Sequence, residues 1–180
     1  MARTFLITGG ANSGKARWAI SYFAHCDNVL YVTSNSDMDD DTKKRMDYST
    51  QENYVTWQAV RHDGKPADII DDEHNYYIYD GLPEYVLSLL GITSDEDHVS
   101  PEKVEEVTKQ AIADINALIE KADHTGSTLI LITLEAGFSV NPFASGQKAF
   151  RDCLSSVNQR IANIADEVYL SVSGIQMQIK

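Results

Sequence analysis

The chain has 180 residues, a length that suits one domain with a sizeable buried core, and we expect residues 1–180 to form a single unit. Its 27 acidic and 15 basic residues give a net charge of −12, which argues against nucleic acid or an anionic membrane surface as the main partner. Two isolated cysteines without metal-ligand spacing, and no apolar run of the ~18 residues that a membrane span needs, predict a reduced, cytoplasmic protein without a membrane partner.

A glycine-rich loop stands between the first apolar run and the first amphipathic run. Residues 5–8, FLIT, predict a buried strand, and residues 17–23 predict a helix. The loop between them matches the phosphate-binding pattern G-x-x-x-x-G-K-[ST] at every position but the last. In such a loop backbone N–H groups turn towards the anion, the following helix directs its positive end at it, and the lysine reaches the β- and γ-phosphates. We therefore predict that the nucleotide is bound by Gly9, Gly10, Ala11, Asn12, Ser13, Gly14, Lys15 and Ala16.

The last position of the pattern is altered. It normally carries a hydroxyl that binds Mg²⁺, whereas this chain has Ala16. Because Mg²⁺ keeps several waters and takes only one or two protein ligands, a water could fill this position. We expect weaker positioning of Mg²⁺ and intact phosphate binding. A glycine-rich turn that binds no ligand is the alternative.

Strands and helices alternate along the rest of the chain. We expect strands over 28–33, 55–60, 76–80, 128–133 and 167–172, with 176–179 as an added edge strand. The strand at 55–60 is expected to be half-buried, because its apolar and polar residues alternate. Helices are expected over 37–45 (polar and solvated), over 82–90, from Pro101 with Ser100 as its N-cap, and over 147–165. This order predicts an α/β fold with a mostly parallel sheet flanked by helices, its phosphate loop following the first strand.

Polar residues stand where three of the expected strands end, and ligands of parallel sheets bind at this edge. Asp80 is the candidate Mg²⁺ ligand, since phosphate-loop enzymes hold the ion with an aspartate at the end of a neighbouring strand; a turn-forming role is the alternative. Glu135 is a candidate base or ligand of a substrate hydroxyl, or a turn residue. Thr33, Ser34 and Asn35 either contact the nucleotide or simply end their strand.

Several segments together resemble one family. They are residues 8–10 with Lys15, residues 31–34, the acidic run 39–41 before Arg45, Trp57, and the C-terminal segments 151–152, 157–162, 165–168 and 172–174. Over nearly its whole length the chain resembles the adenosylcobinamide kinase/adenosylcobinamide-phosphate guanylyltransferase family of cobalamin biosynthesis. The resemblance implies a RecA-like phosphate-loop fold, a homotrimer with sites near subunit contacts, and adenosylcobinamide and ATP or GTP as substrates.

The resemblance also implies two reactions. A nucleoside triphosphate first phosphorylates the aminopropanol hydroxyl of adenosylcobinamide. A histidine then attacks the α-phosphorus of GTP, and the guanylyl group passes to the new phosphate. Lys15, Asp80 and Glu135 are the candidate catalytic residues in this chain.

The histidine of the second reaction has no counterpart at the matching position. Counting without gaps from Tyr31 to Trp57 places Tyr48 there. A tyrosine hydroxyl, with an ordinary pKa of about 10, needs a base or a metal to ionise, so Tyr48 is a poor substitute. His62 is an alternative nucleophile only if the Trp57 register is abandoned. Further departures from the family's motifs fall at Asn12, Ala16, Asn53, Tyr54, Ser88 and Leu134.

The sequence therefore supports three hypotheses. The first is a family member that keeps nucleotide binding and has lost or weakened guanylyl transfer; whether it keeps the kinase reaction is left open. The second is a non-catalytic nucleotide- or corrinoid-binding homologue. The third is a kinase of another small hydroxyl compound.

Overall fold

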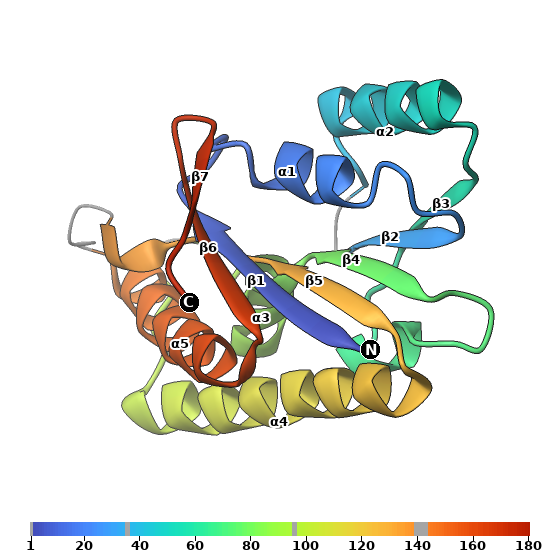
Figure 1. The fold of residues 1–180 in the computed structure, drawn as a ribbon. Coiled ribbons are helices and arrows are strands. Elements are labelled where there is room, and N and C mark those ends of the chain that lie inside the picture. The colour runs from blue at the N-terminus through green and yellow to red at the C-terminus, as the bar shows by residue number, and fades with distance from the viewer. Residues whose placement is uncertain (1, 35–36, 95–96, 139–143) are drawn as a thin grey trace.

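A seven-stranded sheet runs through the centre of the molecule in the order β3-β2-β4-β5-β1-β6-β7 (Figure 1). A computed structural model describes residues 2–34, 37–94, 97–138 and 144–180. The strands are β1 Arg3–Gly9, β2 Val29–Thr33, β3 Trp57–Arg61, β4 Tyr76–Asp80, β5 Thr128–Ile132, β6 Glu167–Val172 and β7 Ile175–Gln178. Neighbouring strands are parallel except β6 and β7, which form an antiparallel hairpin. The predicted α/β class with a mostly parallel sheet is confirmed.

Helices cover both faces of this sheet (Figure 1). They are α1 Lys15–Tyr22, α2 Asp40–Asn53, α3 Leu82–Leu90, α4 Pro101–Thr125 and α5 Ser145–Ile164, with short 3-10 helices at Pro66–Ile69 and Ala136–Phe138. Helices α1 and α2 lie over one face, and α3, α4 and α5 lie over the other. The arrangement is consistent with a phosphate-loop nucleotide-binding fold.

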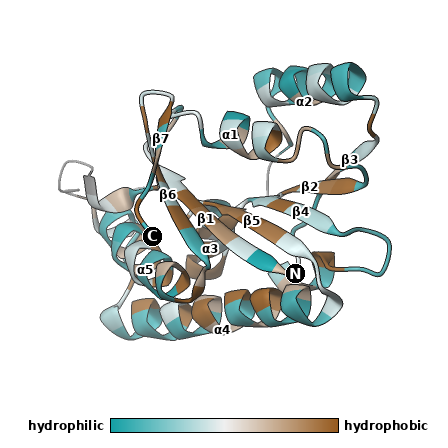
Figure 2. Cartoon of the chain, viewed as in Figure 1, coloured by the Kyte–Doolittle hydropathy of each residue, from teal (hydrophilic) through white to brown (hydrophobic). Residues whose placement is uncertain are grey.

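Figure 2 shows that β5 is hydrophobic along most of its length, as expected for a central strand with both faces of the sheet covered. Along β1, Phe5 and Ile7 pack on the α1 side and Leu6 packs on the α4 and α5 side, and all three are at most 1% exposed. Burying a side chain of this size contributes about 1.5–3 kcal/mol. The core therefore fixes the central strands, whose carboxyl ends carry the candidate site.

Element boundaries follow the sequence predictions with two differences. Helix α4 begins as expected, with the Ser100 hydroxyl accepting the Lys103 N–H at 3.2 Å. The polar helix α2 is longer than expected and ends at Asn53. Strand β3 begins only at Trp57. It is less buried than expected, with Ala59 exposed, because β3 is the outermost strand and pairs with β2 alone.

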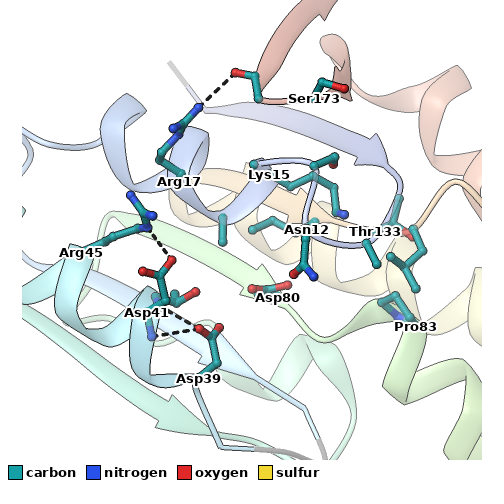
Figure 3. Close-up of a pocket in the computed structure, with 18 of the residues that line it drawn as sticks. Asn12, Lys15, Arg17, Asp39, Asp41, Arg45, Asp80, Pro83, Thr133 and Ser173 are labelled. Atoms are coloured by element: carbon teal, nitrogen blue, oxygen red, sulfur yellow. Dashed lines mark hydrogen bonds and ion pairs between the residues drawn. The ribbon is translucent and has the colours of Figure 1, made fainter.

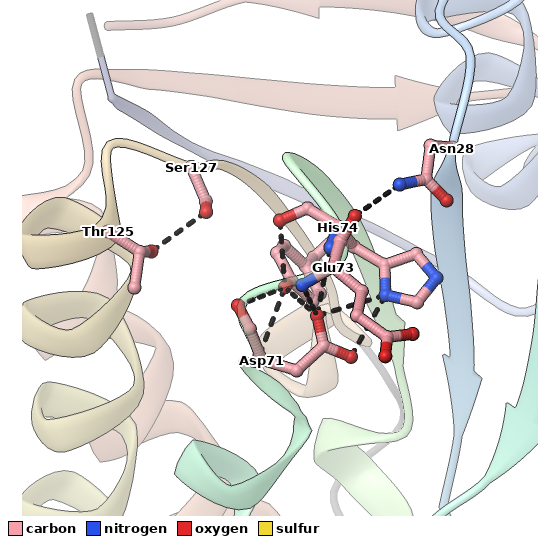
Figure 4. Close-up of polar contacts among 7 residues, drawn as sticks. Asn28, Asp71, Glu73, His74, Thr125 and Ser127 are labelled. Atoms are coloured by element: carbon pink, nitrogen blue, oxygen red, sulfur yellow. Dashed lines mark hydrogen bonds and ion pairs between the residues drawn. The ribbon is translucent and has the colours of Figure 1, made fainter.

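A polar cluster fixes the turn that leads into β4 (Figure 4). The Asp71 carboxylate accepts the His74 N–H at 2.9 Å and the Tyr77 hydroxyl at 2.9 Å, and it contacts Nδ1 of the buried His74 ring. This cluster lies at the amino end of β4, so it stabilises the fold at the edge of the sheet opposite the glycine-rich loop. Within the described residues we find no helix whose length and apolar character would let it cross a membrane.

Candidate active site

The glycine-rich loop connects β1 to α1 and turns sharply twice. Asn12 and Gly14 adopt left-handed backbone conformations, with φ of 54° and 99°, which asparagine and glycine tolerate best. Gly9 has φ 152°, and a Cβ there would lie 2.3 Å from the carbonyl oxygen of Ser171, so no larger residue fits. Gly14 is the N-cap of α1. The unpaired N–H groups of the first helical turn are therefore at the loop, where they favour an anion.

Lys15 lies inside the curve of the loop. Its Nζ donates to the carbonyl oxygens of Gly9 at 3.1 Å and Gly10 at 2.7 Å, and the residue is only 8% exposed. Burial lowers the pKa of Lys15, and the nearby carboxylates of Asp80 and Glu84 oppose this shift. A phosphate entering the loop would offer the ammonium group a charged acceptor in place of neutral carbonyls, and such bonds are stronger.

An open cleft of about 650 Å³ lies over the loop (Figure 3). It is formed by the loop, the start of α2, the ends of β4 and β5, the start of α3 and the tip of the β6–β7 hairpin. The lining residues are Ala11, Asn12, Ser13, Gly14, Lys15, Ala16, Arg17, Asp39, Asp41, Thr42, Arg45, Asp80, Pro83, Glu84, Ile132, Thr133, Leu134, Ser173 and Gly174. The cleft thus lies at the carboxyl ends of the strands, where topology predicts a ligand.

Asp80 ends β4, and Figure 3 shows it across the cleft from the loop. Its Oδ2 accepts a hydrogen bond from the Tyr31 hydroxyl at 2.5 Å. Burial raises the pKa of Asp80, whereas the Tyr31 hydrogen bond and the charge of Lys15 lower it. Burial and the Asp80 charge also raise the pKa of Tyr31 well above its usual value, so this hydroxyl remains a donor at neutral pH. Tyr31 therefore fixes the orientation of the carboxylate in the cleft.

Glu84 is a cleft residue that the sequence analysis missed. It stands in the first turn of α3, four residues after Asp80, and lines the same cleft. Burial raises the pKa of Glu84, and the Asp80 charge adds to this effect while Lys15 opposes it. The spacing of Asp80 and Glu84, four residues apart across the junction between β4 and α3, is a sequence signal that could have identified Glu84 as a cleft residue.

The amino-terminal half of α2 also borders the cleft. Asp39 caps the helix by accepting the N–H groups of Asp41 at 3.1 Å and Thr42 at 3.0 Å. Arg45 donates through Nε to the Asp41 carboxylate at 2.7 Å, one turn earlier on the helix (Figure 3). Sequence reasoning treated this helix as solvated throughout. Its acidic and basic side chains instead place charge on one wall of the cleft.

Thr33 and Ser34 end β2 at the expected edge of the sheet, but neither lines the cleft. Both are buried. The Thr33 carbonyl accepts the His62 N–H at 2.8 Å, and a Cβ on Gly81 would lie 2.3 Å from the Ser34 Cβ. Ser34 therefore packs against the turn that follows Asp80. The third residue predicted here, Asn35, lies outside the described residues.

Glu135 is not brought together with Lys15 and Asp80. Its Oε1 accepts the Gly137 N–H at 3.1 Å, and its Oε2 lies 3.5 Å from the Thr8 hydroxyl. It borders a separate hollow of about 250 Å³, with Thr8, Gly137, Ser155, Asn158, Gln159 and several apolar side chains. In this structure Glu135 therefore faces the α5 side of the sheet.

The two candidate nucleophiles lie outside the cleft lining. Tyr48 is 67% exposed on α2, seven residues after Asp41 and three after Arg45, and so on the same side of the helix but further from the loop. The His62 ring lies 2.9 Å through Nε2 from the Lys65 carbonyl oxygen, in the turn after β3.

Comparison with known proteins yields consistent matches across the chain. A sequence model of the family described as cobinamide kinase / cobinamide phosphate guanyltransferase (CobU) matches residues 5–179. The chain is 30% identical over 181 residues to the bifunctional adenosylcobalamin biosynthesis protein CobU of Escherichia coli K12, covering 97% of this chain and 98% of that protein. It is 31% identical over 182 residues to the protein of the same name from Salmonella typhimurium LT2, with the same coverage.

Proposed function

Because this chain belongs to the cobinamide kinase / cobinamide phosphate guanyltransferase family, we propose that it binds ATP or GTP in the cleft and acts on adenosylcobinamide in cobalamin biosynthesis. In this proposal residues 1–180 are one nucleotide-binding domain. The observation that carries the proposal is the meeting of three features in one cleft: a glycine-rich loop that leads into the N-terminus of α1, the buried Lys15 and the strand-end Asp80.

The loop residues 9–16 hold the phosphates. Backbone N–H groups at the start of α1 bind phosphate oxygens, and Lys15 adds one full positive charge at the β- and γ-phosphates. In the kinase step the acceptor hydroxyl oxygen attacks the γ-phosphorus in line. The bond from the γ-phosphorus to the nucleoside diphosphate breaks as the new one forms.

Charge in the cleft favours a nucleotide that carries a divalent cation. Three basic side chains, Lys15, Arg17 and Arg45, line it together with four acidic ones, Asp39, Asp41, Asp80 and Glu84. A bare triphosphate would therefore meet net repulsion. The oxygen atoms of Asp80 and Glu84 are the donors that Mg²⁺ prefers, and the ion commonly uses one or two carboxylates plus substrate phosphates. Bound Mg²⁺ would neutralise charge on the phosphate oxygens, and Ala16 would contribute no ligand to it.

The geometry of the described residues also fits a Mg²⁺ ion that takes only one or two ligands from the protein. Among the residues that the structure describes, no group of three or more His, Cys, Asp or Glu side chains is placed to hold a metal ion. Asp80, fixed by the Tyr31 hydroxyl, is the proposed main ligand, and Glu84 is the proposed second carboxylate.

Guanylyl transfer is lost or weakened in this proposal. Tyr48 stands at the family's histidine position, is largely exposed to solvent and lies outside the cleft lining, and a tyrosine hydroxyl is a poor nucleophile without a base or a metal to ionise it. Glu135 takes no part in phosphoryl transfer in this proposal, because it faces the α5 side of the sheet and does not line the cleft. A non-catalytic binder is the second candidate function, favoured by the simultaneous changes at Ala16 and Tyr48.

We also propose that the chain forms a homo-oligomer, a trimer by the family resemblance. Support comes from the edge strand β7 and the residues after it, where Ile175, Met177 and Ile179 are 68%, 46% and 60% exposed. Residues two apart in a strand point to the same face, so these side chains form one apolar stripe. Light scattering coupled to size-exclusion chromatography would test the oligomeric state.

The proposed activity is tested by incubating the protein with adenosylcobinamide, Mg²⁺ and either ATP or GTP. We expect phosphorylated adenosylcobinamide at rates on the order of 1 per second or faster, as for ordinary kinases. GTP labelled at the α-phosphate should leave no acid-labile label on the protein. Nucleotide binding without turnover would favour the non-catalytic candidate, and strong labelling of a histidine would contradict the loss of guanylyl transfer.

A further inference from the structure

The β6–β7 hairpin contacts the outer side of the phosphate-binding loop. The Ser171 hydroxyl donates to the Ser13 carbonyl oxygen at 2.7 Å, and the Gly174 N–H donates to the same oxygen at 2.9 Å. The Gln176 side chain in turn donates through Nε2 to the Ser171 hydroxyl at 3.0 Å. Ser171 is 1% exposed. A single loop carbonyl is therefore held by two donors from a segment about 160 residues further along the chain.

Holding this carbonyl also orients an N–H group. The C=O of Ser13 and the N–H of Gly14 belong to one planar trans peptide, in which the two groups point in opposite directions. Because the hairpin holds the oxygen, the Gly14 N–H must point away from the hairpin. Figure 3 shows the hairpin tip with Ser173 on one side of the loop and Asp80 on the other, so an N–H group that points away from the hairpin points towards the Asp80 side of the cleft, whose lining also includes Ser173 and Gly174 at the hairpin tip.

The loop glycines pack directly on the hairpin. A Cβ on Gly14 would lie 3.2 Å from the Gly174 Cα, and a Cβ on Gly9 would lie 2.3 Å from the Ser171 oxygen. Arg17, in the first turn of α1, donates through Nη2 to the Gly174 carbonyl at 3.1 Å. The hairpin thus contacts the beginning of the loop, its end and the helix that follows it.

We propose that the β6–β7 hairpin, through Ser171 and Gly174, positions the phosphate-binding loop so that the Gly14 N–H is aimed into the cleft before the nucleotide arrives. This inference rests on the proposed function of the cleft. Ser171 is a positioning residue, because it acts on the loop backbone and does not line the cleft. A loop held in its binding conformation avoids the free-energy cost of ordering on binding. The proposal also gives a role to residues 172–174, one of the C-terminal segments that resemble the family and to which the sequence analysis assigned no function.

The test compares two serines that are equally buried. Ser127 is also 1% exposed, and its hydroxyl bonds the Thr125 hydroxyl at 2.8 Å next to the amino end of β5, far from the loop (Figure 4). Ser171→Ala and Ser127→Ala each remove one buried hydroxyl. Calorimetric titration of both variants with Mg²⁺–ATP, Mg²⁺–GTP and inorganic triphosphate measures the effect on the loop, and urea unfolding measures the effect on the fold.

We expect Ser171→Ala to weaken binding of the nucleotide and of triphosphate alike, about 5- to 10-fold, the effect of losing one net hydrogen bond. Ser127→Ala should leave both affinities within about twofold of wild type while lowering stability to a similar degree. In ¹⁵N-labelled protein without ligand, the Gly14 amide resonance should move in the first variant and stay in place in the second. If Ser171→Ala does not fold, Gln176→Met on the edge strand should still weaken binding about threefold.

Two results would overturn the inference in distinguishable ways. Wild-type protein that binds neither nucleotide nor triphosphate would refute the proposed function, and the role of the hairpin with it. Wild-type binding with unchanged affinity in both Ser171→Ala and Gln176→Met, and an unmoved Gly14 amide, would refute the role of the hairpin alone.

Discussion

Neutralising Asp80 should change the Mg²⁺ dependence of nucleotide binding more than the binding itself. The cleft lining carries one more acidic than basic side chain, so Asp80→Asn brings it to neutrality. The substitution keeps an oxygen that can accept the Tyr31 hydroxyl, which preserves the local structure. Two unit charges ~5 Å apart, as across one bound Mg²⁺, interact by about 3 kcal/mol at an effective dielectric constant near 20. Solvent and salt reduce this repulsion between Asp80 and the triphosphate. If about 1.4 kcal/mol of it remains, its removal raises the affinity for ATP tenfold.

The assay is calorimetric titration with ATP, in Mg²⁺ and in excess chelator. We expect Asp80→Asn to bind Mg²⁺-free ATP about tenfold more tightly than wild type and to gain about tenfold less affinity from Mg²⁺. Asp123→Asn, the same charge change at an exposed position on α4 across the sheet, is the matched control and should leave both values unchanged. Equal loss of affinity with and without Mg²⁺ would refute the proposed role of Asp80.

Asp80→Asn should also stabilise the ligand-free protein at neutral pH. Burial raises the pKa of Asp80 in the folded state above its unfolded value, so the ionised carboxylate opposes folding. The protonated form of Asp80 is the one that the folded state favours. Its contribution to stability is fully present below the ordinary pKa of about 3.9 and is lost as the pH rises through the raised pKa of the folded state. The variant's Tm should therefore exceed that of wild type at pH 7, and the difference should vanish towards pH 4. A lower Tm at pH 7 would contradict this account of the carboxylate.

Three further predictions concern single substitutions. Ala16→Ser should strengthen the Mg²⁺ dependence of ATP binding several-fold, because it restores the hydroxyl ligand, and an unchanged dependence in titrations would count against that reading. Glu84→Gln should raise the Tm at pH 7 but not near pH 4, by the same reasoning as for Asp80, which scanning calorimetry at the two pH values would decide. Leu118→Ala, at a fully buried α4 position, should lower the free energy of unfolding in urea by about 2–5 kcal/mol, whereas Leu87→Ala, on the exposed side of α3, should lower it by less than about 1 kcal/mol.

The glycine-rich loop between β1 and α1 was predictable because everything that defines it is local. The strand, the glycine spacing, Lys15 and the helix all fall within about 20 residues, and each depends on short-range chemistry. The sheet class followed from the alternation of strands and helices. The position of Asp80 followed from the rule that parallel strands bring their carboxyl ends to one edge.

Which way a side chain points beyond a strand end was not predictable from the sequence. Thr33 and Ser34 are at the expected edge but are buried beside the neighbouring turn. Glu135 is at the expected edge but faces the other side of the sheet. Thr33 is the last residue of β2 and is covered within the sheet, whereas Ser34 and Glu135 lie beyond the ends of β2 and β5, where the alternation that assigns faces within a strand is no longer a guide.

Long-range pairing accounts for the remaining differences. The contact of Ser171 with the loop exists because β6 pairs with β1, and the sequence order of the strands does not reveal this neighbour. Arg45 reaches the cleft because α2 packs beside α1, whereas its charge pattern alone indicated a solvated helix. Tertiary packing therefore determines which residues surround the loop, whereas the loop itself is determined by its local sequence.

The most direct test is a calorimetric titration of wild-type protein and Lys15→Ala with ATP and GTP in the presence of Mg²⁺. Wild type should bind at least one of the two with a Kd between about 1 μM and 1 mM, the usual range for enzyme substrates. Lys15→Ala should weaken that binding at least about tenfold. Lys44→Ala, an exposed lysine on α2, should leave it unchanged. No binding by wild type, or equal binding by Lys15→Ala and wild type, would contradict the account.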